Sequence, residues 1–196
     1  MKRIVLVSPN WIGDALLATA GLRMLRKAYP QAEISVLAVP RAAEAFERNP
    51  DVARVIVNEE ETQPFWYPLA LIQKLGKFDF DAAFLFHRSR SRAVWTFLAG
   101  IPVRAGYNTK GRGIFLSHAV DEPLHVLHRV DALQHLLNGI GIAGKAPAPV
   151  FAVGEEAGAR MRRRLGRGKY AVLNPGGNWL AKRWPVERFA ALADLL

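Results

Sequence analysis

The sequence predicts an α/β fold, in which a Rossmann-like parallel sheet carries helices on both faces. Short runs rich in valine and isoleucine alternate along the chain with stretches whose apolar residues recur at helical spacing. Hydrophobic residues make up 51% of the 196 residues and charged residues 22%, which is typical of a globular protein with a buried core. Strands that alternate with helices form parallel sheets, because each helix returns the chain to the starting edge of the sheet.

The first strand is expected at residues 4–7, which are four consecutive aliphatic residues. The helix that follows ends at Tyr29, because the residue before Pro30 avoids the helical backbone conformation. The same patterns predict further strands at 33–38, 55–57, 81–86 and 103–106, and helices at 14–28, 41–48, 69–77, 91–98 and 126–138. Residues 107–113, rich in glycine and basic residues, are expected to form a loop.

A domain boundary is predicted near residue 145. Residues 143–149 contain Gly144, Lys145 and two prolines, a composition typical of a linker. A basic helix at 155–165, a new first strand at 170–174 and a helix at 185–196 are expected after it. We therefore expect one domain over residues 1–145, and a linker with the truncated start of a second domain over residues 146–196.

The composition limits the classes of function. The absence of cysteine excludes disulfides and thiolate metal sites, and no stretch approaches the roughly 20 apolar residues of a membrane span. We expect a cytoplasmic protein. The formal charge of +10 favours an anionic partner, such as a phosphorylated substrate or an anionic membrane surface. Nucleic acid is not expected, because the basic residues are spread along the chain without interleaved aromatic residues.

The loop after the first strand, residues 8–14, lies where ligands bind in open parallel sheets. Gly13 would let the backbone turn sharply or approach a ligand. Asp14 has two interpretations: the N-cap of the following helix, or a general base that accepts a proton from an attacking hydroxyl. The loop has neither the three glycines of a dinucleotide fingerprint nor the Gly-Lys-Ser/Thr of a phosphate-binding P-loop.

A second strand-to-helix loop covers residues 174–185. Gly176 and Gly177 allow backbone N–H groups to approach an anion, Lys182 adds a positive charge, and Pro185 suits the first position of a helix. Glycines, a cation and a helix start together predict a cradle for a diphosphate. The alternative is an ordinary turn.

A third feature is the run of basic residues 87–92, which follows the fourth strand and contains Arg88, Arg90 and Arg92. Arginine suits bidentate binding of carboxylates and phosphates. The alternative is a solvated helix start. Weaker candidates for the same role are Arg41, Lys110 and Arg112. The five histidines show no spacing typical of a metal site, so no metal is expected.

Three stretches carry a specific resemblance. Residues 4–25 with Gly13-Asp14, residues 97–107 and residues 175–190 resemble glycosyltransferase family 9. The likeness covers essentially the whole chain. Within the family the chain looks most similar to lipopolysaccharide heptosyltransferases of the second-heptose type.

The resemblance implies the N-terminal half of a GT-B fold, with an acceptor-binding domain at 1–145 followed by the start of a nucleotide-sugar-binding domain. It implies an inverting, metal-independent transfer of heptose from ADP-L-glycero-β-D-manno-heptose to the lipopolysaccharide inner core, without a cofactor. Asp14 matches the family's proposed base. The residues that match the donor loop are Gly176, Gly177, Asn178 and Lys182. The expected acceptor site combines Asn10, Trp11, Gly13, Arg88, Arg90 and Arg92.

The family's later donor-domain motifs, an aspartate and a glycine-rich segment with histidine, have no match in this sequence. We therefore expect the chain to be an inactive fragment of the catalyst. Two alternatives stay open: a GT-B transferase that uses another nucleotide sugar, and a non-catalytic acceptor-binding module. Because the implied acceptor is anchored in a membrane, peripheral contact with the inner membrane is also expected.

Overall fold

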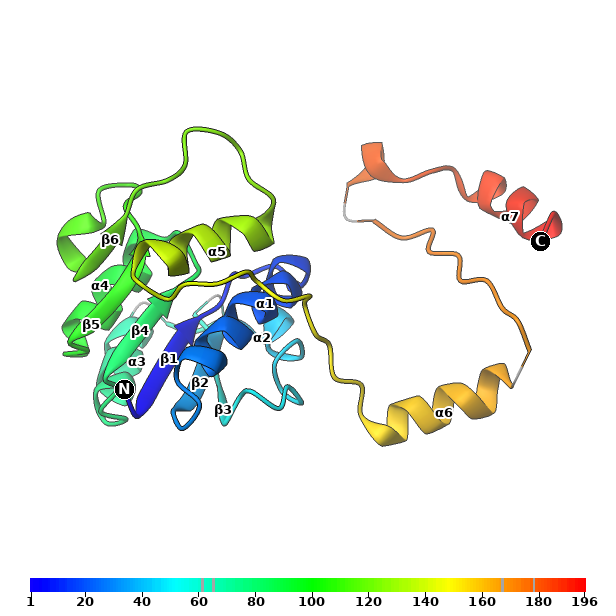
Figure 1. Cartoon of the computed structure of the whole chain (residues 1–196). Helices are drawn as coiled ribbons and strands as arrows, with labels where there is room; N and C mark the ends of the chain where they lie inside the picture. The colour runs from blue at the N-terminus through cyan, green and yellow to red at the C-terminus, as the bar shows by residue number, and fades with distance from the viewer. Residues whose placement is uncertain (61, 65, 167, 178) are drawn as a thin grey trace. The chain divides into compact units, whose positions relative to one another are not determined.

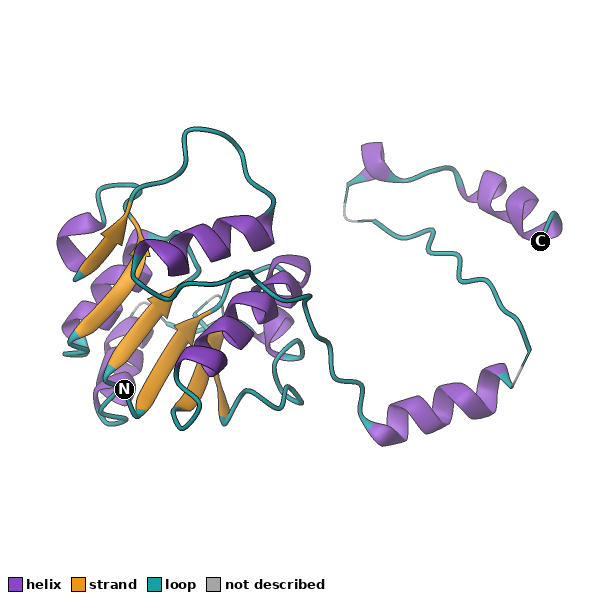
Figure 2. Cartoon of the chain, in the orientation of Figure 1, coloured by secondary structure: helices purple, strands orange, loops and turns teal. Residues whose placement is uncertain are grey.

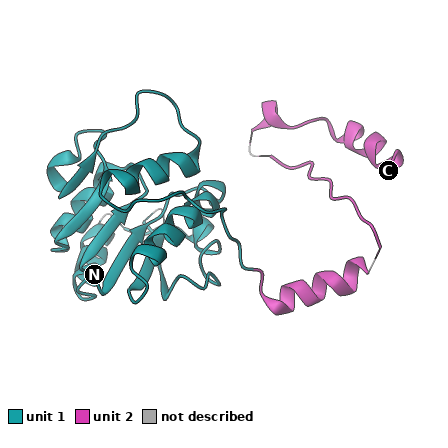
Figure 3. Cartoon of the chain, in the orientation of Figure 1, with its two compact units in different colours: residues 1–152 teal, residues 153–196 magenta. Residues whose placement is uncertain are grey.

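The computed structural model describes residues 1–196 apart from 61, 65, 167 and 178. The chain divides into two compact units, Met1–Ala152 and Val153–Leu196 (Figure 3). Unit 1 contains the sheet and its core. Unit 2 contains the segment expected to bind the donor.

Unit 1 is built on a six-stranded sheet in which every neighbouring pair is parallel (Figure 2). The strands are β1 (Arg3–Val7), β2 (Glu33–Ala38), β3 (Arg54–Val57), β4 (Ala82–Leu85), β5 (Val103–Tyr107) and β6 (His118–Val120). Their order, β3-β2-β1-β4-β5-β6, is that of the Rossmann fold. The order reverses between β1 and β4, and the carboxyl ends of these two strands therefore border a crevice.

Helices cover both faces of the sheet (Figure 1). The helices α1 (Ile12–Ala28), α2 (Pro40–Ala43) and α5 (Arg129–Gly139) pack on one face, and α3 (Tyr67–Gly76) and α4 (Arg90–Leu98) pack on the other. Successive side chains of β1 serve both cores: Ile4 and Leu6 pack with α1, whereas Val5 and Val7 pack with α3 and α4. The predicted fold class is confirmed.

Several predicted boundaries differ from those in the structure. The predicted helix 41–48 ends at Ala43, because Ala45 and Phe46 donate to carbonyls three residues back, at 3.3 and 2.9 Å, and form tighter turns. The predicted helix 126–138 begins at Arg129, where the His128 ring accepts a capping bond from the Val130 N–H. The short strand β6 was not predicted, since its three residues form no apolar run.

Helix α1 begins two residues before Asp14, and its N-cap is Trp11, which makes no side-chain capping bond. The N-cap interpretation of Asp14 is therefore wrong. Asp14 lies in the first turn of the helix, and its carboxylate pairs with another helix instead.

Unit 2 contains α6 (Glu155–Leu165), the 3-10 helix η2 (Leu180–Lys182) and α7 (Val186–Asp194). The strand predicted at 170–174 is wrong: these residues form no strand, and the side chain of Val172 is 79% exposed. A strand needs hydrogen-bonding neighbours, and the described residues of unit 2 include no other strand. Pro185 is the N-cap of α7 and not its first residue.

Among the described residues, no helix combines the length and the apolar character needed to cross a membrane.

Candidate functional site

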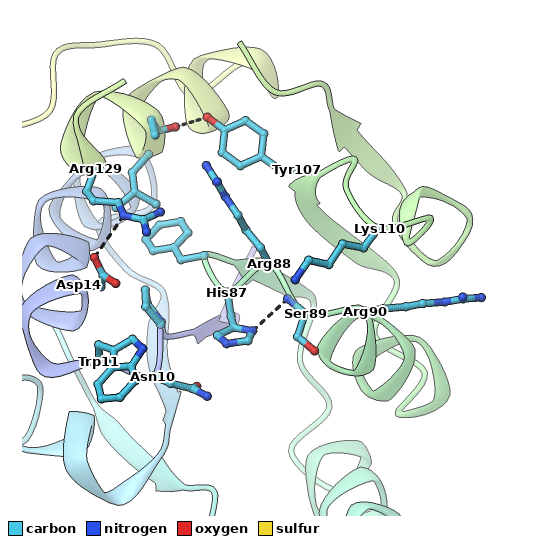
Figure 4. A pocket seen from close by; sticks show the side chains of 14 residues that line it. Asn10, Trp11, Asp14, His87, Arg88, Ser89, Arg90, Tyr107, Lys110 and Arg129 are labelled. Atoms are coloured by element: carbon cyan, nitrogen blue, oxygen red, sulfur yellow. Dashed lines mark hydrogen bonds and ion pairs between the residues drawn. The ribbon is translucent and has the colours of Figure 1, made fainter. Parts of the chain in front are cut away.

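A pocket of about 350 Å³ opens at the carboxyl ends of β1 and β4, in the crevice that the strand order creates (Figure 4). Its walls come from the loop before α1, the loop between β4 and α4, the end of β5 and the first turns of α5. Predicted site residues that line the pocket are Asn10, Trp11, Asp14, Arg88 and Arg90. The sheet topology therefore gathers two of the three sequence features.

Asp14 lies on the wall formed by α1, and its Oδ1 is 3.2 Å from Nε of Arg129, the first residue of α5. The Asp14 side chain is 28% exposed and that of Arg129 is 55% exposed. A pair this exposed contributes at most about 1 kcal/mol to stability. Its main consequence is therefore positional: Arg129 holds the carboxylate at the pocket edge while leaving the second oxygen for another partner (Figure 4). Arg129 belongs to no local motif, so nothing in the sequence pointed to it.

Arg88 projects into the pocket between α5 and β5. Its Nη1 is 2.8 Å from Glu122 Oε1, and its guanidinium lies over the Tyr107 ring, 5.2 Å from the ring centroid. The Tyr107 hydroxyl in turn donates to the Ala132 carbonyl of α5. Burial raises the pKa of Tyr107, so this hydroxyl stays a neutral donor. Arg88 is thus pre-positioned on a rigid wall.

Two further cations stand at the pocket, Arg90 and Lys110. Arg90 lies over the Phe115 ring and points away from the pocket centre, whereas Lys110 reaches toward Arg88 and Ser89 (Figure 4). Within the described part of the chain neither has a carboxylate partner. The pocket therefore carries an uncompensated positive charge that would attract an anionic ligand.

Arg92 is separated from the other two arginines. Its side chain is only 3% exposed and forms an ion pair with Glu60. The Arg92 guanidinium carbon lies over the Trp95 ring, 4.3 Å from the ring centroid. Burial acts to raise the pKa of Glu60, but hydrogen bonds from Arg92 and Asn58 outweigh it and the pKa is lowered. Arg92 does not line the pocket, because residues two apart at the start of α4 face different sides of the helix.

Asn10 and Trp11 of the first loop line the pocket. The Trp11 side chain is 58% exposed, and the Arg41 guanidinium lies 4.9 Å from its ring centroid. Gly13 is in the first turn of α1, and a methyl group there would meet no atom within 4 Å other than those of the adjoining residues and of the helix backbone itself. The fold therefore does not require glycine at position 13, and the space beside it is open.

Arg112, a weaker candidate from the sequence, lies beneath the pocket wall and is fully buried. Its Nε donates to the Tyr107 carbonyl at 2.7 Å, and its Nη1 donates to the carbonyls of His87 and Ser89 at 2.5 and 3.3 Å. Burial lowers the pKa of Arg112 to about 10. The side chain therefore ties the β4–α4 loop to the end of β5, and it acts on the pocket through the backbone.

His87 is a pocket residue whose ring is fixed by the Ser89 N–H, which donates to Nδ1 at 3.0 Å. The neutral ring therefore carries its proton on Nε2. Burial, with the nearby positive charges of Arg92 and Arg112, lowers the pKa of His87 to about 4. His87 thus offers the pocket a neutral N–H donor at physiological pH.

His87 should make stability depend on pH. Its folded-state pKa lies below the ordinary value of 6.5, so between about pH 6.5 and 4 the unfolded chain binds a proton that the folded chain does not. Stability is therefore expected to fall as the pH drops through this window, by about 1–2 kcal/mol after allowance for partial exposure of the ring. The measurement is urea unfolding at pH 7 and pH 4.5 for the wild type and His87→Asn, whose Oδ1 can replace Nδ1 as acceptor. An equal pH dependence in both proteins would contradict the assignment.

Of the predicted donor residues, Gly176, Gly177 and Lys182 lie in unit 2, and Asn178 lies outside the described residues. The Gly176 N–H donates to Asn174 Oδ1 at 3.1 Å, and Arg183 Nε donates to the Gly177 carbonyl at 2.5 Å. These bonds fold the glycine segment back on itself just before α7. Lys182 is exposed and ends η2 close to the start of that helix.

Among the described residues, no group of three or more histidine, cysteine, aspartate or glutamate side chains could hold a metal ion.

Comparison with known proteins gives one family. The model of glycosyltransferase family 9 (heptosyltransferase) matches residues 68–196. Lipopolysaccharide heptosyltransferase 2 of Escherichia coli (strain K12) is 28% identical over 214 residues, covering 99% of this chain and 60% of that protein. Lipooligosaccharide heptosyltransferase 2 of Haemophilus influenzae is 27% identical, covering 98% of this chain and 60% of that protein. The chain thus spans about 60% of the length of these curated relatives.

Solved structures show the same fold. A glycosyl transferase family 9 structure from Veillonella parvula superposes with a TM-score of 0.83 at 22% identity, over 99% of this chain and 59% of that one. The structure of E. coli ADP-heptose lps heptosyltransferase II superposes with a TM-score of 0.72 at 23% identity, over 100% of this chain and 61% of that one. E. coli heptosyltransferase WaaC with ADP gives a TM-score of 0.73 at 23% identity, over 99% of this chain and 63% of that one.

Proposed function

The chain belongs to glycosyltransferase family 9, and we propose that it supplies the acceptor site and the first part of the donor site of a lipopolysaccharide heptosyltransferase. The proposed reaction moves heptose from ADP-L-glycero-β-D-manno-heptose to the lipopolysaccharide inner core, as the names of the relatives suggest. The observation that carries the proposal is the placement of Asp14 at the edge of a cationic pocket, beyond the carboxyl ends of the central strands.

In the proposed mechanism, Asp14 accepts the proton of an acceptor hydroxyl while the oxygen of that hydroxyl forms a bond to the anomeric carbon of the donor. The bond between that carbon and the diphosphate oxygen breaks, and its electron pair leaves with ADP. Attack from the face opposite to ADP inverts the anomeric centre. Arg129 keeps the carboxylate aimed at the pocket, since it binds Oδ1 and leaves Oδ2 available for the hydroxyl.

The acceptor would be held by the cations of the pocket. Carboxylates and phosphates of the inner core match Arg88, Arg90 and Lys110, because guanidinium and ammonium groups bind such anions by charge-assisted hydrogen bonds. The neutral His87 ring is suited to a sugar hydroxyl, to which Nε2–H can donate. Arg92 is proposed to position the start of α4 rather than to touch the acceptor, since it is buried against Glu60.

The donor diphosphate would be bound in unit 2 by Gly176, Gly177, Asn178 and Lys182, without a metal ion. Backbone N–H groups at a helix start and a lysine can together stabilise the charge that develops on the leaving diphosphate.

Lys182→Ala is expected to weaken binding of the donor. A charge-assisted hydrogen bond contributes about 1.5–3 kcal/mol, which corresponds to a rise of roughly 10- to 150-fold in KM for the nucleotide sugar. The measurement is steady-state kinetics of the whole enzyme that carries this sequence. Lys169→Ala, which removes an exposed lysine of the same unit outside the loop, is the control and should leave KM unchanged. Similar kinetics for both variants would remove Lys182 from the donor site.

The overall function is tested by release of ADP from the whole enzyme, with ADP-heptose and a Kdo-lipid A acceptor that already bears one heptose. Release that requires the acceptor supports the proposal. Turnover with a different nucleotide sugar, and none with ADP-heptose, would retain a glycosyltransferase but overturn the substrate. Acceptor binding by the chain without transfer from any donor would identify an acceptor-binding module instead.

A further inference from the structure

The segment between β6 and α5, residues 121–128, displays apolar side chains to solvent; we refer to it as the apolar loop. Leu124 and Val126 are 106% and 101% exposed, so neither has any protein cover. Figure 1 shows the apolar loop arching away from the body of unit 1 between β6 and the start of α5. Single exposed apolar residues are common on proteins, but two fully exposed aliphatic side chains on one projecting tip suggest a docking surface.

Both ends of the apolar loop are fixed to the body of unit 1. At the first end, Asp121 Oδ1 accepts a hydrogen bond from Asn108 Nδ2 at 3.0 Å, and Glu122 pairs with Arg88 at 2.8 Å. At the second end, the His128 ring caps α5 by accepting from the Val130 N–H. The polar residues thus anchor the segment while the apolar residues between them point outward. This arrangement displays Leu124 and Val126 from a supported base.

Cations surround the base of the apolar loop. Arg88 and Arg129 adjoin its two ends, where they pair with Glu122 and Asp14, and Arg90 and Lys110 line the same pocket without a carboxylate partner among the described residues. The side chain of Trp11, on the opposite rim of the pocket, is 58% exposed. Aliphatic side chains above a group of cations match the chemistry of an anionic bilayer surface. The anionic lipid headgroups attract the cations, and the aliphatic side chains enter the region where headgroups and acyl chains meet.

We propose that the apolar loop inserts Leu124 and Val126 into the interface of an anionic lipid bilayer, and so turns the pocket toward a membrane-anchored acceptor. The choice of acceptor rests on the proposed function, whereas the lipid contact does not. A lipid surface is favoured over a protein partner because the area that two side chains can bury is small. It is far below the roughly 800 Å² that each partner buries in a stable protein interface. Burial of two aliphatic side chains, together with the attraction of nearby basic residues to anionic headgroups, is a combination that gives reversible membrane binding.

The test is sedimentation of the 196-residue chain with vesicles of phosphatidylcholine, with and without phosphatidylglycerol. The wild type is expected to bind the anionic vesicles, and the double variant Leu124→Ser/Val126→Ser to bind them at least 10-fold more weakly. Leu98→Ser is the matched control, since Leu98 is 56% exposed at the far end of α4 and should not affect binding. Equal vesicle binding by the wild type and the double variant would overturn the proposal. So would self-association of the wild type without vesicles that is lost in the double variant, because the apolar loop would then bind a second copy of the chain.

A direct readout of insertion uses the absence of cysteine from the chain. Leu124→Cys, labelled with an environment-sensitive fluorophore, should shift to the blue on addition of anionic vesicles, whereas the same label at Leu98→Cys should not. Because Leu124 is fully exposed, the substitution leaves the core intact. A label at position 124 that stays in water while the chain is bound would exclude insertion.

An activity assay distinguishes failure of the lipid contact from failure of the proposed function. In the whole enzyme, the double variant should retain its activity toward a water-soluble, deacylated acceptor and lose activity only toward acceptor embedded in vesicles. Vesicle binding without any heptose transfer would contradict the proposed function and leave the lipid contact standing. Equal activity of wild type and double variant toward the embedded acceptor would contradict the role given to the loop.

Discussion

Asp14→Asn should reduce kcat of the whole enzyme by about 10²- to 10⁴-fold, the usual contribution of a positioned general base. The amide keeps the size of the carboxylate and can still accept from Arg129, but it cannot take up the proton of the acceptor hydroxyl. The loss should therefore appear in kcat, with little change in KM for either substrate. The measurement is ADP release under saturating acceptor and donor.

Unfolding measurements distinguish a loss of catalysis in Asp14→Asn from a loss of folded protein. Removing one side of a partly exposed ion pair costs at most about 1 kcal/mol, so Asp14→Asn should unfold almost as the wild type does. Asp131→Asn is a matched control, because Asp131 also lies in the first turn of a helix and does not line the pocket. If Asp14→Asn retains wild-type kcat, the general-base assignment fails, and Asp14 serves only to join α1 to α5.

Arg112→Met is expected to give the largest loss of stability, about 2–4 kcal/mol. Three carbonyl groups would lose a hydrogen bond. The Tyr107 carbonyl keeps the Thr109 N–H, at 3.0 Å, but the carbonyls of His87 and Ser89 lose the donor that Arg112 supplies, and each acceptor left unpaired costs about 1–3 kcal/mol. Removal of a desolvated positive charge offsets part of this cost, as the lowered pKa of Arg112 indicates. Methionine fills a similar volume, so the loss reports on hydrogen bonds more than on packing. The measurement is urea unfolding of the 196-residue chain at pH 7.

Arg48→Met makes the same chemical change at an exposed position of unit 1, and it should alter stability by no more than about 0.5 kcal/mol. Arg112→Met should also weaken acceptor binding, because the loop that carries His87 and Arg88 loses its tie to β5. Unchanged stability of Arg112→Met would mean that the carbonyls find other partners, and the positioning role of Arg112 would be wrong.

The sequence determined much of the fold of unit 1. Aliphatic runs such as 4–7 and 33–38 are strands that must be buried on both faces, and the stretches between them have helical periodicity. The same reasoning failed at 170–174. A run of apolar residues forms a strand only beside another strand, and the described residues of unit 2 provide none.

Local sequence also identified which chemical groups lie near the pocket, since a loop that follows a parallel strand must emerge at the ligand-binding edge. It could not show which face of a helix each group occupies. Arg90 and Arg92 look equivalent in the sequence, yet Arg90 lines the pocket and Arg92 is buried with Glu60. The difference arises from the 100° turn between helical residues and from the segment that packs against α4.

By itself, then, the sequence determined the α/β class, the parallel sheet, the strand-to-helix loops and the candidate Asp14. Only the tertiary structure decided that Asp14 pairs with Arg129, that Glu122 holds Arg88, and that Arg112 supports the wall from below. Backbone preferences and hydrophobic periodicity act over a few residues, so the local sequence encodes them. Ion pairs and buried hydrogen bonds join residues that are distant in the chain, and they exist only once the order of strands and the packing of α1 on α5 have brought those residues together.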